Sequence, residues 1–296
     1  MKNKNIAQIS LSVLISLFLC SNNNLARTKK IDSLKTRLSK AEGFFSEILL
    51  LNKISTNYSQ INLDSAKIYL DEARNKLENH SDDYLTADYY KAYGIYLWKS
   101  GQIKEAIDYL KISADLFSSL DSISDLQYVT NIIGICYFKL DMNDSAILYQ
   151  KRVTEMFDLT TTNDSKFRML GANYTNLANI YSNNNDNKKA IDYYLKALNM
   201  FRKINSEENI AIIFDNVGRV NLEIKEYSKA VKHFKDAISI NKKIGNNHLL
   251  CQNYNGIGAV YQNLKKYDSA YYYLNEAIKI SEESGFKIIL AQSNHS

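Results

Sequence analysis

The sequence predicts an all-α protein built as a solenoid of about six antiparallel helix pairs. Similar segments recur about every 40 residues, proline is absent from all 296 residues, and glycine occurs only 10 times. Proline breaks helices, and proline and glycine together mark turns, so their scarcity favours helices joined by small polar turns over a sandwich or barrel of strands. The 45% hydrophobic and 23% charged residues are typical of a folded globular chain.

The first 26 residues predict a signal peptide or N-terminal anchor. MKNKN carries two lysines, and the apolar, serine-containing run IAQISLSVLISLFLC follows it. Cleavage after Ala26, lipid attachment at Cys20 and a retained anchor all remain open. Each predicts an exported protein, periplasmic or associated with the cell envelope, which touches the membrane only through this segment. Residues 27–43 are expected to form a lead-in helix.

Six copies of one pattern follow over residues 44–284. Each copy has a small residue on a first helix and an alanine twelve positions later on a second helix. The pairs are Gly94 and Ala106, Gly134 and Ala146, Ala178 and Ala190, Gly218 and Ala230, and Gly258 and Ala270. The first copy is weaker, with Ile54 at the small position and Ala66 as its alanine.

These small residues are expected to lie where two helix backbones touch. Residues four apart share a helix face, so the large residues four positions after the alanines should interlock around each contact. These are Leu110, Tyr194, Phe234 and Leu274, with Gln150 as a polar exception. Glycine costs about 1 kcal/mol in a helix interior, so its recurrence at one register predicts compensating packing.

The turns within the copies are polar: SGQIK, LDMND, NNNDN, KEYS and KKYD. Asp64, Asp144 and Asp268 each stand directly before a Ser-Ala pair, which predicts that they cap the second helices. Most of the 22 tyrosines, including Tyr193, Tyr194 and 271–273, are expected to be packing residues.

The repeats resemble the tetratricopeptide repeat (TPR) family over residues 44–284. The family pattern W-x2-L-G-x2-Y followed by A-x3-F-x2-A is matched by YTNLANIY and AIDYYLKA, and again by YNGIGAVY and AYYYLNEA. The usual tryptophan and closing proline are missing. The period is about 40 rather than ~34, as in the variety found in kinesin light chains and many bacterial regulatory proteins. The resemblance implies a right-handed superhelical solenoid with an extended concave surface.

The resemblance also implies where a ligand binds. TPR proteins hold extended peptides with first-helix residues two or three positions before the small residue and one after it. The candidate ligand residues at these positions are Lys91, Asn131, Thr175, Asn176, Asn179, Asp215, Asn216, Arg219 and Asn255. Asparagine amides both donate and accept, which suits a peptide backbone, and arginine suits a carboxylate. Asparagine is common throughout this chain, however, and that bias alone would also populate these positions.

No feature of the sequence predicts catalysis. The net charge is +5, but lysines alternate with acids, which indicates a solvated helical surface rather than a nucleic-acid site. A nucleophile elbow, a phosphate loop and a zinc-binding helix are all absent. Cys136 and Cys251 are expected to be buried and unbridged, and the histidines show no ligand spacing with them, so no metal or cofactor is expected.

Two functions therefore remain open. The first is an exported, non-catalytic scaffold that binds a peptide or protein segment. The second is a sensory or regulatory segment of a bacterial signal-transduction system without its output domain, because residues 27–73 also resemble the opening of exported TPR segments in bacterial signalling proteins. Residues 285–296 track 245–256 and predict a truncated first helix of a seventh copy, which either pairs with another chain or marks a shortened relative of longer sensors.

Overall fold

The computed structural model describes residues 20–78, 80–157 and 163–284, with side chains from Arg27 onward. Of the predicted signal peptide over residues 1–26, only residues 20–26 lie in this range, and the side chain of Cys20 is not among those described. The predicted seventh-copy helix over 285–296 lies wholly outside the described residues.

Every regular element in the described ranges is an α-helix, which confirms the all-α prediction. The helices are α2 (Cys20–Leu38), α3 (Phe44–Tyr58), α4 (Leu63–Leu77), α5 (Asp83–Lys99), α6 (Ile103–Ser119), α7 (Ile123–Lys139), α8 (Asn143–Glu155), α9 (Asp164–Asn183), α10 (Asn187–Lys203), α11 (Glu207–Glu223), α12 (Tyr227–Ile244), α13 (Asn247–Asn263) and α14 (Tyr267–Ser284).

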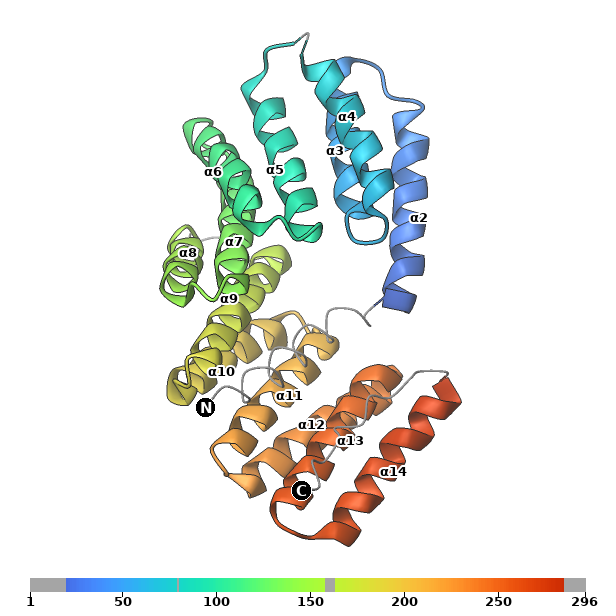
Figure 1. Cartoon of the computed structure of the whole chain (residues 1–296), viewed down its shortest axis with the longest axis vertical. Coiled ribbons are helices and arrows are strands. Elements are labelled where there is room, and N and C mark those ends of the chain that lie inside the picture. Colours follow the sequence, from blue (N-terminus) through green and yellow to red (C-terminus); the bar gives the residue numbers. More distant parts are fainter. Residues whose placement is uncertain (1–19, 79, 158–162, 285–296) are drawn as a thin grey trace. The chain divides into compact units, whose positions relative to one another are not determined.

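The chain divides into two compact units, Met1–Tyr149 and Gln150–Ser296, and each is described by itself. In unit 1, α3 packs against α4 and α5 against α6 (Figure 1). In unit 2, the pairs are α9 with α10, α11 with α12, and α13 with α14. Within each unit, successive pairs stack on one another, so most helices bury one side against their own pair and another against the next.

Helix α2 overlaps the lead-in helix predicted over residues 27–43, but it begins at Cys20, within the predicted signal peptide, and ends at Leu38. Its Ile31 and Leu34 pack on Leu50 and Ile54 of α3. The chain then turns, and Gly43 precedes α3 with a φ of 94°, a conformation that favours glycine.

The small residues lie at the helix contacts, as the pattern predicts. A Cβ atom on Gly94 would lie 2.6 Å from Leu110 Cγ, and one on Gly258 would lie 2.8 Å from Leu274 Cδ2. The fully buried ring of Phe234 fills the space beside two glycines. A Cβ on Gly218 of its own pair would come within 2.9 Å of its ring, and one on Gly256 of the next pair within 2.7 Å. The alanines of the second helices are buried: Ala106, Ala146, Ala190, Ala230 and Ala270.

The predicted capping role of Asp64, Asp144 and Asp268 is wrong. Each lies within the first turn of its helix. The cap of α4 is Asn62, whose side chain accepts a hydrogen bond from the backbone N–H of Ser65 at 2.9 Å. A carboxylate in a first turn still interacts favourably with the helix dipole, which explains why aspartate recurs there.

An aromatic side chain stands three positions after the alanine in every copy and contacts an aromatic ring on the first helix of its pair. The pairs are Tyr58–Tyr69, Tyr93–Tyr109, Tyr137–Tyr149, Tyr181–Tyr193, Phe214–His233 and Tyr261–Tyr273. The packing role predicted for the tyrosines therefore holds for most of the chain. It is wrong for Tyr271 and Tyr272, which are 69% and 59% exposed.

His233 replaces tyrosine in this series and should make unit 2 sensitive to pH. Burial lowers the pKa of His233 below its ordinary value, and Asp236 at 4.0 Å offsets this only in part. The unfolded chain therefore binds the proton more readily, so the stability that neutral His233 contributes is complete above about pH 6.5 and is lost as the pH falls below it.

We expect His233→Tyr to flatten the dependence of urea-induced unfolding on pH between about 7.5 and 5.5. His248, whose pKa burial also lowers, should leave a residual slope. An unchanged pH profile in the variant would contradict this role of His233.

Candidate functional site

The candidate site lies on the first helices of unit 2, on a surface that we call the amide face. Most of its residues on one helix lie three or four apart, with Thr175 and Asn176 adjacent, and all are half-buried. They are Thr175, Asn176 and Asn179 on α9, Asn209, Ile212, Asn216 and Arg219 on α11, and Asn255 on α13. Six of the predicted ligand residues thus share one surface with Asn209 and Ile212, which the prediction missed.

A hollow of about 160 Å³ opens on the amide face between α9 and α11. Its apolar wall consists of Ala172, Phe201, Ile212 and Ile213. Its polar wall consists of Thr175, Asn176 and Asn209. An apolar recess next to amide groups is the usual make-up of a site that takes one side chain and hydrogen-bonds the atoms around it.

Arg219 is held in place by a chain of hydrogen bonds that runs into the core of unit 2. Its Nε donates to Asp215 Oδ2 at 2.7 Å. Asn253 Nδ2 on α13 donates to Asp215 Oδ1, also at 2.7 Å, and Asn241 Nδ2 on α12 donates to Asn253 Oδ1 at 2.8 Å. Asp215, predicted as a ligand residue, is only 5% exposed. It therefore positions Arg219 rather than meeting a ligand itself.

Three other predicted residues differ in how far their polar atoms are already engaged. The Thr175 hydroxyl donates to the backbone carbonyl of Gly171, and Asn179 Oδ1 accepts from the Tyr194 hydroxyl. Asn255 Oδ1 is buried without a hydrogen-bond partner among the described groups. An unsatisfied buried oxygen costs free energy, so Asn255 is a locally unfavourable feature of this helix.

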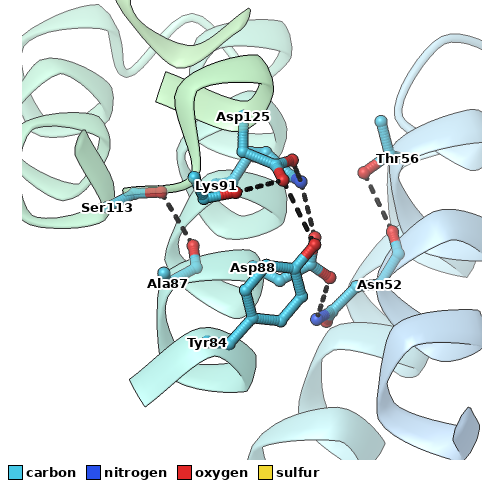
Figure 2. A network of polar contacts seen from close by, with 9 residues as sticks. Asn52, Thr56, Tyr84, Ala87, Asp88, Lys91, Ser113 and Asp125 are labelled. Carbon is cyan, nitrogen blue, oxygen red and sulfur yellow. Dashed lines mark hydrogen bonds and ion pairs between the residues drawn. The ribbon is translucent and has the colours of Figure 1, made fainter. Parts of the chain in front are cut away.

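In unit 1, the predicted ligand residue Lys91 belongs to a network that ties three first helices together (Figure 2). Its Nζ contacts Asp88 Oδ1 at 2.5 Å on its own helix and Asp125 Oδ1 at 2.9 Å on α7. Asp88 accepts from Asn52 Nδ2 of α3 at 2.9 Å, and Asp125 accepts from the Tyr84 hydroxyl at 3.1 Å. These contacts use Lys91 to join α5 to α7, while Asp88 joins α5 to α3.

The electrostatics of this network agree with its geometry. Burial alone would lower the pKa of Lys91, but Asp88 and Asp125 raise it above its ordinary value. Burial would likewise raise the pKa of Asp125, yet the bonds from Lys91 hold it below its usual range. Both groups are thus charged near neutral pH. The remaining predicted residue of unit 1, Asn131, lies half-buried on α7.

The residues missed by the sequence prediction obey the same helical period. Ile212 and Asn209 lie six and nine positions before Gly218, the glycine of their copy. They are thus one and two helical turns before Asn216, on the same face of α11. Extending the ligand pattern backwards from Asn216 by four residues and then by three more would have found them. Asp125 also lies nine positions before its glycine and could have been found in the same way.

Sequence models of the tetratricopeptide repeat match residues 169–243 and 252–284. The chain contains tetratricopeptide repeats. The two TPR matches fall within unit 2, on the helices that carry the amide face. No curated protein sequence matches the chain.

Solved structures show the same fold along most of the chain. The apo form of RapI is 17% identical with a TM-score of 0.72, over 87% of this chain and 77% of that one. A Rap protein complexed with Competence and Sporulation Factor is 18% identical with a TM-score of 0.61, over 86% and 70%. A signal transduction ATPase from Pyrococcus horikoshii with a TPR sensor is 19% identical with a TM-score of 0.68, over 88% and 40%. These identities are low, so the likeness concerns the fold.

TPR arrays generally mediate protein or peptide binding. This chain is accordingly a helical-repeat scaffold of the protein-binding kind. None of the described helices has the length and apolarity needed to cross a membrane.

Proposed function

We propose that this TPR protein is a non-catalytic scaffold that binds an extended peptide or protein segment on the amide face of unit 2. The single observation that carries the proposal is the hollow between α9 and α11, with Thr175, Asn176 and Asn209 beside its apolar wall. One apolar side chain of the ligand enters this hollow. The amides of α9 and α11 then hydrogen-bond the backbone on either side of it.

Arg219 sets one end of this site. Asp215 holds its Nε, so the guanidinium is fixed before a ligand arrives, which reduces the entropy that binding costs. Its terminal amino groups are left for carbonyl or carboxylate oxygens of the ligand. Asn255 on α13 is half-buried at the other end of the amide face. A Rap protein of similar fold was solved complexed with Competence and Sporulation Factor, which supports a binding role for this fold.

Replacing Asn176, Asn216 and Arg219 together with alanine should weaken peptide binding by about tenfold or more, because several hydrogen bonds to one ligand are lost. Peptides would first be selected from a random display library against the wild-type protein and then measured by fluorescence anisotropy. The helical circular dichroism signal should not change at about 25 °C, although losing Arg219 leaves the buried Asp215 without its counter-ion and should lower the urea midpoint of unit 2. The matched control replaces Asn199, Arg202 and Asn275, exposed residues of second helices in the same unit, with alanine. Equal affinities for both triple variants would refute the amide face as the site.

The charged and apolar N-terminal sequence supports export of this scaffold to the periplasm or cell envelope. A fusion of residues 1–43 to a reporter enzyme that folds only outside the cytoplasm should be active. An inactive fusion that is nevertheless made in normal amounts would contradict export.

A second candidate function is a sensory segment that passes a binding signal to a separate output protein. The observation in its favour is the match to a signal transduction ATPase of which this chain covers only 40%, and whose TPR part is described as a sensor. A sensor must bind its output protein differently with and without peptide. A two-hybrid assay against bacterial sensor kinases would compare the wild-type protein with the triple alanine variant. A different interaction signal for the two would favour the sensor, and no signal for either would favour the scaffold.

A further inference from the structure

Unit 2 carries a second hollow, at the edge formed by the turns of its last two helix pairs. It measures about 610 Å³ and lies between the α11–α12 turn and the α13–α14 turn. Tyr227, Val231, Tyr261 and Leu264 form its apolar part. None of these residues belongs to the amide face, so the hollow is independent of the proposed peptide site.

The apolar wall of this hollow is packed against the core and open to solvent at its rim. The ring of Tyr261 stacks on Tyr273 with centroids 5.5 Å apart and planes 8° from parallel. Tyr227 and Val231 pack on the core of the last two pairs. Leu264 remains 37% exposed and Tyr267, the next aromatic residue along the turn, 67% exposed. Ordered aromatic and aliphatic groups exposed around a recess are typical of a protein docking site.

Positive side chains outnumber negative ones around the hollow. Lys225 and Lys266 line it, and Lys265 stands between Leu264 and Lys266. The acid in the lining, Glu226, is 3.4 Å from Lys229 of α12, which does not line the hollow. No salt bridge within the described residues occupies Lys225, Lys265 or Lys266. The recess is therefore apolar at its base and has lysines on its rim.

We propose that this turn-edge hollow docks an acidic segment of a partner protein, with one large apolar side chain in the recess and carboxylates beside Lys225 and Lys266. The complementary charge of the rim selects an acidic segment. The concave form favours a protein segment over a membrane, because interfacial membrane binding uses the apolar face of an amphipathic helix laid into the bilayer surface. One helical array thus holds two different protein segments, one on the amide face and one on the turn edge.

The test uses two short acetylated peptides measured by fluorescence anisotropy at low salt. One has a central leucine flanked by Asp and Glu, and the other has Asn and Gln in their place. The acidic peptide should bind, and more tightly than the amide peptide. Lys225→Glu combined with Lys266→Glu should weaken the binding about tenfold. Lys232→Glu combined with Lys235→Glu changes the same charge on exposed residues of α12 outside the hollow and should leave it unchanged.

A variant of the apolar wall and a vesicle-binding measurement test the proposal further. Leu264→Ser should reduce the advantage of a leucine-centred acidic peptide over a serine-centred one, and since Leu264 is exposed, folding should not suffer. Vesicles of phosphatidylcholine with and without phosphatidylserine test the membrane alternative. The proposal is overturned by equal binding of the acidic and amide peptides, by equal affinities of the two lysine double variants, or by binding to anionic vesicles alone.

Discussion

Phe234→Ala is expected to lower the free energy of unfolding of unit 2 by about 3–5 kcal/mol, within the range for removing a fully buried aromatic ring. The ring fills the space left by two glycines, Gly218 on α11 and Gly256 on α13. Neither glycine has a side chain that could relax into the cavity, so the loss should fall at the upper end of that range. Urea unfolding followed by circular dichroism measures the change.

The matched control is Leu195→Ala on α10, which removes a large apolar side chain that is 52% exposed. Exposed substitutions usually change stability by no more than about 0.5 kcal/mol. If Phe234→Ala cost no more than Leu195→Ala, the packing of the ring between the two glycines would not be what holds these helix pairs together.

The contacts inside each helix pair could be predicted from the sequence because they repeat. Gly94, Gly218 and Gly258 each face the large residue four positions after the partner alanine, as the pattern requires. The contact of Phe234 with Gly256 could not be predicted in this way. It joins one pair to the next, and its place depends on how far successive pairs rotate, which the period alone does not fix.

The candidate site was predictable as a surface but not residue by residue. The position of each residue relative to the small residue of its copy placed six of the predicted residues on the amide face, because residues three or four apart share one side of a helix. Register could not show that Lys91 and Asp215 already have partners. Asp125 and Asn253 stand one copy further along and at different registers, so only the packing of neighbouring helices brings them together.

Lys91→Met is expected to destabilise unit 1 by about 3 kcal/mol while leaving peptide binding on the amide face unchanged. The side chain of Asp88 is only 5% exposed, and removing the lysine leaves this carboxylate charged, buried and without its counter-ion. Methionine keeps most of the packing volume, so the loss reports on the charge. Chemical denaturation measures stability, and anisotropy with the library-selected peptides measures binding.

Two comparisons separate this network from an ordinary surface ion pair. Lys67→Met breaks a pair with Asp71 in which both side chains are about half exposed, and it should change stability by no more than about 1 kcal/mol. Lys91→Met combined with Asp88→Asn removes the stranded charge but keeps an oxygen for Asn52, so it should recover at least half of the loss. If the double variant were as unstable as Lys91→Met alone, the uncompensated charge of Asp88 would not be the cause. If instead Lys91→Met weakened peptide binding without changing stability, Lys91 would belong to the ligand site after all, as its register first indicated.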